Sequence, residues 1–187
     1  MRRHGDTLVA STNFGRERRV ILAGHLDTVP VIDNFPPRWL EPGDPLIRED
    51  VAAGHEQERV LWGRGATDMK GSDAVMLYLA ATLTDAKYDL TYVFYDHEEV
   101  AAEKNGLRKV VEAHPDWISG DFAIIGEPTD CGIEGGCNGT MRFDVITHGI
   151  AAHSARAWMG KNAIHAAAEI LNRLNAYEKY VRLKWMA

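Results

Sequence analysis

Three short apolar runs, separated by stretches with helical periodicity, most constrain how this chain can fold. The runs are Arg19–Ala23 (RVILA), Leu90–Tyr95 (LTYVFY) and Phe122–Ile125 (FAII), and helical patterns occupy Asp73–Leu83 and Asn105–Ala113. Continuous apolar runs of this length are typical of strands buried on both faces. Alternation of strands and helices predicts an α/β fold, with a mixed, largely parallel sheet and helices on both faces.

Two further segments belong to the same predicted domain. Thr7–Thr12 (TLVAST) favours a short strand. Pro30–Gly54 contains many prolines and acids, which predicts a long loop. FAII should form another short buried strand.

The pattern changes near residue 138, where we expect a domain boundary. Thr140–Thr147 (TMRFDVIT) alternates apolar and polar residues, as a half-exposed antiparallel strand does. Lys161–Tyr180 has an apolar stripe at helical spacing, with Asn162 as its expected cap. We therefore predict one domain over residues 1–137 and part of a smaller α+β domain over 138–187.

Composition excludes several classes of protein. The net charge of −6 argues against nucleic-acid binding, and no apolar run approaches the length of a transmembrane helix. The N-terminus lacks the apolar region of a signal peptide. Cys131 and Cys137, the only cysteines, make no disulfide framework, so we expect a reducing, cytoplasmic location with neither membrane nor nucleic-acid partners.

Acidic and imidazole side chains recur at the ends of predicted strands and at turns. Such ends are where ligands bind in α/β sheets. Carboxylates held close together repel one another, and a divalent metal would offset that repulsion. One imidazole with several carboxylates suits zinc, manganese or cobalt. The residues concerned are His25 and Asp27, Asp68, the pair Glu98 and Glu99, and Glu127.

Each of these residues also has a simpler explanation. His25 could be an ordinary hydrogen-bonded residue at a strand end, and Asp27 or Asp68 could only cap a turn or a helix. Glu98–Glu99 could be a solvated charge pair, and Glu127 an ordinary loop acid. Recurrence after successive apolar strands favours the metal-site interpretation over these single-residue alternatives.

Five motifs along the chain resemble the M20 metallopeptidase family, a group of co-catalytic zinc amidases. They are GHLDTVP, GRGATDMKG, YDHEEV, GEPT and GIAAHSARAWMGKNAIHAAAEIL, in the family's order and spacing, from about Arg19 to Tyr177. Within the family the resemblance is strongest to the actinobacterial type of succinyl-diaminopimelate desuccinylase. It implies a zinc-peptidase-like catalytic domain with part of a lid or dimerisation domain.

The resemblance also implies roles for individual residues. It makes Glu98 the general base and Asp27 the acid that orients a liganding histidine. It implies two zinc ions, for which cobalt or manganese could substitute. The implied metal ligands are His25, Asp68 as the bridging carboxylate, Glu99 and Glu127.

His153 resembles the family histidine that one subunit supplies to its partner's active site to stabilise an oxyanion. That resemblance implies a homodimer formed through the second domain. None of the other histidines matches the family's last zinc ligand, which lies in a late C-terminal segment. The chain is therefore expected to be a fragment whose second zinc site is one ligand short.

The implied reaction is hydrolysis of N-succinyl-L,L-diaminopimelate to succinate and L,L-diaminopimelate, a step towards lysine and cell-wall precursors. Acetylornithine deacetylase, or another M20 hydrolase acting on N-acyl amino acids, is the alternative within the family. An inactive fragment, which binds metal without catalysing a reaction, is an alternative from a different functional class. A purely structural module is a third, although the retention of Asp68 and Glu98 argues against it.

Overall fold

A computed structural model of the chain describes residues 1–49, 53–130, 132–136 and 142–177. The chain divides into two compact units, Met1–Glu134 and Gly135–Ala187. Cys131 and Cys137 lie outside the described residues.

The first unit is built on a five-stranded mixed sheet in the order β1-β2-β6-β3-β7. Strands β6, β3 and β7 run parallel to one another, and β7 forms an edge of the sheet. β1 and β2 are antiparallel to their neighbours. The apolar runs therefore form parallel strands, as their composition predicted. The bounds are β1 Arg2–His4, β2 Thr7–Ser11, β3 Arg19–His25, β6 Asp89–Tyr95 and β7 Phe122–Ile125.

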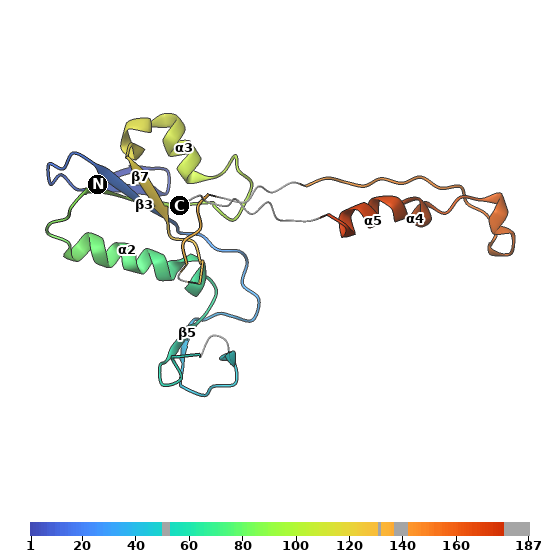
Figure 1. The fold of residues 1–187 in the computed structure, drawn as a ribbon, viewed down its shortest axis with the longest axis horizontal. Coiled ribbons are helices and arrows are strands. Elements are labelled where there is room, and N and C mark those ends of the chain that lie inside the picture. The colour runs from blue at the N-terminus through green and yellow to red at the C-terminus, as the bar shows by residue number, and fades with distance from the viewer. Residues whose placement is uncertain (50–52, 131, 137–141, 178–187) are drawn as a thin grey trace. The chain divides into compact units, whose positions relative to one another are not determined.

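Two helices cover opposite faces of this sheet, α2 (Gly71–Thr82) on one and α3 (Gly106–Ala113) on the other (Figure 1). The side chain of Asn105 caps α3 by accepting a hydrogen bond from the N–H of Arg108 at 3.0 Å. Two apolar clusters fill the space between helices and sheet, which confirms the predicted α/β class. One consists of Val9, Ile21, Ala23, Val93, Tyr95 and Val110, and the other of Met69, Met76, Tyr92 and Phe94.

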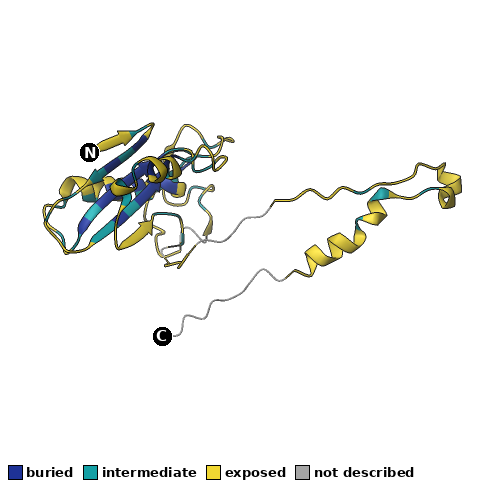
Figure 2. Cartoon of the chain, turned by 90° about the horizontal axis from the view of Figure 1, so that it is seen from above, coloured by how far each residue is buried: buried dark blue, intermediate teal, exposed yellow. Residues whose placement is uncertain are grey.

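The edge strand β7 differs from its prediction, because all four of its residues are exposed rather than buried. Phe122 is 63% exposed and Ile125 is 46% exposed. In the part of the chain that the structure describes, β7 pairs with β3 alone, so its other edge has no strand beside it. Figure 2 shows the burial concentrated in the middle of the sheet. An apolar run predicts a strand but not how many layers cover it.

The segment predicted as one long loop contains a small strand pair. β4 (Arg38–Leu40) pairs with β5 (Val60–Trp62) in a separate two-stranded sheet, so the loop prediction is wrong at Arg38–Leu40. The guanidinium of Arg38 lies 5.0 Å from the centre of the Trp62 ring. Such cation–π contacts stabilise a pair of strands that has little core of its own.

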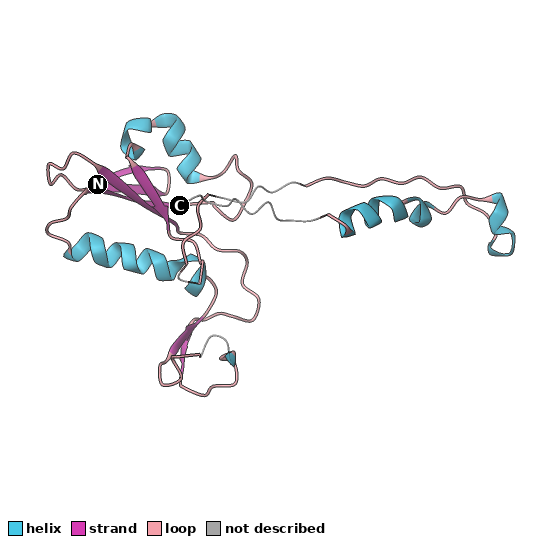
Figure 3. Ribbon diagram, in the orientation of Figure 1, coloured by secondary structure: helices cyan, strands magenta, loops and turns pink. Residues whose placement is uncertain are grey.

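The regular elements of the second unit, among the residues that the structure describes, are short helices joined by loop segments (Figure 3). It contains the 3₁₀ helix η3 (Ser154–Met159) and the α-helices α4 (Ala163–Ala166) and α5 (Ala168–Asn175). The predicted helix over residues 161–180 is therefore interrupted at Ala167, and its residues 178–180 lie outside the described part. The predicted cap is confirmed, since Asn162 Oδ1 accepts a hydrogen bond from the Ile164 N–H at 2.8 Å.

The predicted strand at 140–147 is wrong over 142–147, which form neither helix nor strand, and residues 140–141 lie outside the described part. A segment with alternating apolar and polar residues forms a strand only where another strand pairs with it. The described residues of this unit supply only an isolated bridge, between Ile150 and Lys161. No helix among the described residues is long and apolar enough to cross a membrane.

Candidate metal centre

Three predicted ligands meet at the carboxyl end of the parallel strands in the first unit. His25 is the last residue of β3, and Glu127 follows β7 by two residues. Asp68 lies in the short irregular helix η1 (Ala66–Lys70), between β5 and α2. One ligand atom from each of the three lies within 4.8 Å of the others. Because parallel strands end at a common edge, residues about 40 to 100 positions apart become neighbours.

The imidazole of His25 is held in one orientation by a partner on each nitrogen. The side chain is only 1% exposed. Its Nδ1 lies 3.0 Å from the backbone carbonyl of Asp27, and its Nε2 lies 2.9 Å from Asp68 Oδ1. A carbonyl oxygen can only accept, so Nδ1 donates the proton to it. Nε2 is then the nitrogen directed at the acids, as a metal ligand requires.

The electrostatics of this cluster favour a bound cation. Burial raises the pKa of the Glu127 carboxyl, and the charges of Asp68, Glu98 and Glu99 raise it further against the opposing effect of His25. Burial alone would lower the pKa of His25, but its hydrogen bond to Asp68 and the charge of Glu127 raise it instead. These acids crowd together without enough positive charge. The nitrogen and oxygen donors suit zinc and similar ions, so the residues present fit a divalent metal.

Asp27 fixes the segment that follows β6. Its carboxylate accepts hydrogen bonds from the backbone N–H groups of Glu98 and Glu99, at 3.0 and 3.1 Å. Burial alone would raise the pKa of Asp27, but these two donors outweigh it and hold the pKa below its ordinary value. The contact to the His25 ring is made by the Asp27 carbonyl, whereas the carboxylate oxygen is 3.6 Å from Nδ1. Asp27 thus links the histidine to the two glutamates.

The remaining predicted site residues are placed as follows. Glu98 and Glu99 are half-buried beside the Asp27 carboxylate, outside the group formed by His25, Asp68 and Glu127. His153 lies in the second unit, where its Nδ1 accepts a hydrogen bond from the Ala155 N–H at 3.1 Å.

Two buried residues below the cluster were not singled out from the sequence. Met69 is fully buried directly after Asp68, and the peptide bond between them is cis. Asp73, in the first turn of α2, is 5% exposed, and burial raises the pKa of its carboxyl. The glycines that directly precede His25 and Glu127 were an available signal, because a glycine beside a functional residue often permits a close approach.

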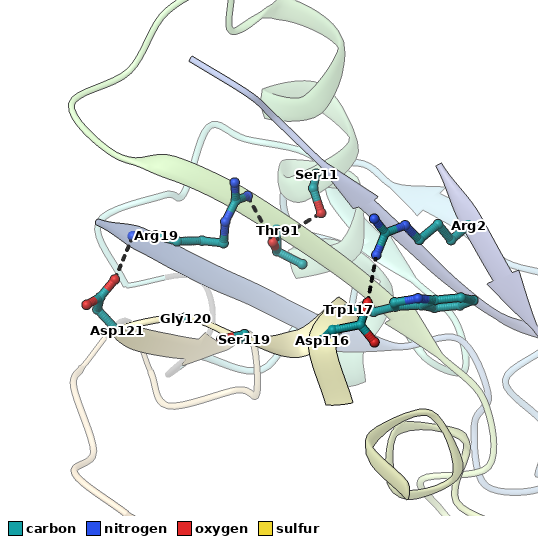
Figure 4. Close-up of a pocket in the computed structure, with 9 residues that line it drawn as sticks. All are labelled: Arg2, Ser11, Arg19, Thr91, Asp116, Trp117, Ser119, Gly120 and Asp121. Carbon is teal, nitrogen blue, oxygen red and sulfur yellow. Dashed lines mark hydrogen bonds and ion pairs between the residues drawn. The ribbon is translucent and has the colours of Figure 1, made fainter. Parts of the chain in front are cut away.

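A second polar feature lies at the opposite end of the sheet. A cavity of about 400 Å³ is bordered by Arg2, Arg19, Asp116, Trp117 and Asp121, among others (Figure 4). Its arginines already have acidic partners. Arg2 forms an ion pair of 3.8 Å with Asp116, and the guanidinium of Arg19 lies 3.8 Å from the Asp89 carboxylate. Asp121 accepts a hydrogen bond of 2.8 Å from the backbone N–H of Arg19. Of these two sites, only the one at the carboxyl end of the strands has acids without matching positive charge.

A histidine and two carboxylates thus converge at the carboxyl edge of an α/β sheet, an arrangement that suits a divalent metal ion. Comparison with known families makes this specific. The profile of peptidase family M20/M25/M40 matches residues 21–182. The chain belongs to this family, as the motifs indicated.

Individual relatives point to one branch of the family. A protein provisionally named succinyl-diaminopimelate desuccinylase DapE, found in two strains of Mycobacterium tuberculosis, is 47% identical over 175 residues. Succinyl-diaminopimelate desuccinylase of Corynebacterium glutamicum is 42% identical over 179 residues. These alignments cover 94% of this chain but only 45% and 44% of the relatives. The chain thus spans less than half the length of the curated relatives that it matches.

Proposed function

We propose that this chain contributes the metal-binding part of an amidase that removes the succinyl group from N-succinyl-L,L-diaminopimelate. The observation that supports it most is the convergence of His25, Asp68 and Glu127 beside two glutamates held by Asp27. Family membership and the names of the two relatives support the hydrolase class and the substrate. Acetylornithine and other N-acyl amino acids are the alternative substrates.

The chain's own residues divide the work. His25, Asp68 and Glu127 would hold the metal, with the imidazole oriented by the Asp27 carbonyl. A bound zinc ion would polarise the amide carbonyl and lower the pKa of a water molecule. If two zinc ions bind, as we propose, Asp68 would serve as a ligand to both and Glu99 would help to hold the second. Cobalt or manganese would substitute for zinc.

Glu98 acts as the general base. Its carboxylate takes a proton from the attacking water and returns it to the nitrogen of the leaving amine, so succinate and a free amine are formed without a covalent intermediate. Glu98 is suited to this task because Asp27 fixes its backbone N–H, which limits where the side chain can reach. A base must lie within hydrogen-bond reach of the proton that it removes.

We also propose the remaining features of the family arrangement. The second unit forms a homodimer contact, and His153 of one subunit stabilises the oxyanion in the other. Backbone and side-chain donors aimed at such an oxygen are among the largest contributions to catalysis. The protein acts in the cytoplasm.

The direct test is metal binding followed by hydrolysis. The metal-free 187-residue chain is titrated with zinc at neutral pH in a calorimeter, and the loaded protein is incubated with N-succinyl-L,L-diaminopimelate or N-acetylornithine. Release of a primary amine from the succinyl compound, faster than from acetylornithine, is expected. The matched control is Glu98→Gln, which should bind zinc with unchanged affinity and lose at least about 100-fold in rate.

The outcomes separate the competing proposals. Zinc binding without turnover of either substrate would favour the inactive metal-binding fragment. Preference for acetylornithine would move the chain to the alternative branch. A Glu98→Gln variant with undiminished rate would remove Glu98 from the role of base.

A further inference from the structure

Met69 occupies the point where the ligand-bearing segments come together. It directly follows Asp68 in η1 and is 0% exposed. It belongs to the apolar cluster between α2 and the sheet, with Met76 among its neighbours. A methionine side chain is unbranched and adapts its shape to irregular gaps.

Its thioether contacts the segment that bears His25. The backbone N–H of His25 donates to Met69 Sδ at 3.2 Å. The Met69 methyl carbon lies against Gly24, such that a Cβ added to Gly24 would be only 2.8 Å from it. A side chain at position 24 would therefore displace Met69.

The same methyl carbon contacts the segment that bears Glu127. A Cβ added to Gly126 would also lie 2.8 Å from Met69 Cε. Ala23 of β3 pairs with Ile125 of β7. Gly24 and Gly126 directly follow these two residues, at the ends of adjacent strands. The methyl group thus lies against both glycines, each of which directly precedes a metal ligand.

We propose that Met69 is a positioning residue that sets the spacing of His25, Asp68 and Glu127. It is joined covalently to Asp68 and touches the backbone immediately before each of the other two ligands. The two glycines provide the room that its methyl group needs. This inference rests on the proposed metal site and adds a residue that touches neither metal nor substrate.

The experiment compares two buried methionines of one cluster. Met69→Ala and Met76→Ala remove the same side-chain atoms from one cluster, and both methyl carbons border Gly126. Met69 is the one whose sulfur accepts the N–H of His25 and whose methyl carbon borders Gly24. Thermal unfolding measures the structural cost of each. Competition titrations with Co²⁺ measure affinity, and the visible absorption of bound Co²⁺ reports the geometry of its ligands.

We expect Met69→Ala to lower Co²⁺ affinity by at least about 10-fold and to change the Co²⁺ spectrum, since loss of a supporting residue typically costs that much. Met76→Ala should keep the affinity within about 3-fold and keep the spectrum, although both variants lose stability. Equal affinities and spectra for the two variants would overturn the proposal.

Met69→Leu decides the matter if Met69→Ala does not fold. Leucine keeps the apolar volume but cannot accept the His25 N–H, and its branched end is too short to lie between the glycines. A folded Met69→Leu protein should bind Co²⁺ more weakly than the wild type with an altered spectrum. Wild-type affinity and spectrum in this variant would refute the role of Met69. Absence of Co²⁺ binding by the wild type would instead refute the proposed metal site itself.

Discussion

Asp89 and Asp73 are equally buried carboxylates at opposite ends of the sheet, and their surroundings differ completely. Asp89, 4% exposed, accepts hydrogen bonds from the N–H groups of Phe14 and Arg16 and from the Thr12 hydroxyl. Asp73, 5% exposed, has no hydrogen-bond partner on either oxygen within the described part of the chain. An acid supplied with donors serves the fold, whereas acids left without them favour a cation.

The pKa values follow the same division. The N–H of Phe14 is the main cause that holds the pKa of Asp89 below its ordinary value, with Arg16, Thr12 and Arg19 acting in the same direction against burial. Burial raises the pKa of Asp73, and the charges of Lys70 and His25 only partly oppose it. Glu127, in the metal cluster, is shifted upward as well. The carboxyl end of the sheet therefore holds negative charge that the protein alone does not neutralise.

The largest effect should come from Asp68→Asn at the carboxyl end. The substitution removes the negative charge of the carboxylate that lies 2.9 Å from the His25 Nε2, so zinc affinity should fall by at least about 100-fold. Calorimetric titration measures it. Asp85→Asn, at an exposed ion pair with Arg16, is the matched control and should bind zinc normally. A fall in zinc affinity of 3-fold or less for Asp68→Asn would mean that the acids at the carboxyl end of the sheet do not hold the metal.

Asp27→Asn should have an intermediate effect. An amide has one oxygen, so its NH₂ group would face one of the N–H donors of Glu98 and Glu99. We expect zinc affinity to fall by about 10-fold, as is typical for residues that support a ligand. Hydrogen exchange at the Glu98 and Glu99 amides should become faster. Unchanged exchange would show that the Asp27 carboxylate does not hold this segment.

Asp89→Asn tests the amino end, where stability should change and metal binding should not. The amide would oppose the Arg16 N–H, so Tm at pH 7 should fall by several degrees. Because the folded pKa lies below the unfolded value of 3.8, the wild-type advantage exists above pH 3.8 and disappears as pH falls further. Thermal unfolding between pH 3 and 7 measures this. A change in zinc affinity would contradict the division between the two ends.

Asp73→Asn should have the smallest effect, and of opposite sign. The folded pKa is raised above 3.8, so the buried charge destabilises the metal-free fold at neutral pH and ceases to do so below about pH 3.8. The metal-free variant should therefore unfold a few degrees higher at pH 7, with no gain at acidic pH. The gain should shrink when zinc is bound, because the metal offsets the charge. A lower Tm at pH 7 would show that Asp73 has a stabilising partner.

Local pattern was sufficient to predict the longer elements of the first unit. β3, β6 and β7 follow from apolar runs, α2 and α3 follow from helical spacing, and in the second unit the cap at Asn162 is local as well. β1, β4 and β5 were not predicted, because three residues each are too few to show a pattern. Patterns that need a distant partner were less informative. The exposure of β7 and the absence of a strand at 142–147 depend on which segments lie alongside, which periodicity does not report.

The candidate site shows the same limit. Motif resemblance selected His25, Asp68 and Glu127, and these three meet. It did not predict that the Asp27 carbonyl, rather than its carboxylate, makes the closer contact to the His25 ring. Met69 lies within the GRGATDMKG motif but the resemblance gave it no role, and Asp73 lies outside the five motifs. Their importance comes from contacts with Gly24, which belongs to a segment more than 40 positions away.

The outer edge of β7, which no strand among the described residues covers, has a practical consequence for the metal titrations. Backbone groups on this edge, with exposed Phe122 and Ile125 beside them, can pair with the same edge of another molecule. Self-association of this kind grows with protein concentration and releases or absorbs heat of its own. Dilution experiments without metal, run first, will give the concentration below which a calorimetric signal belongs to zinc alone.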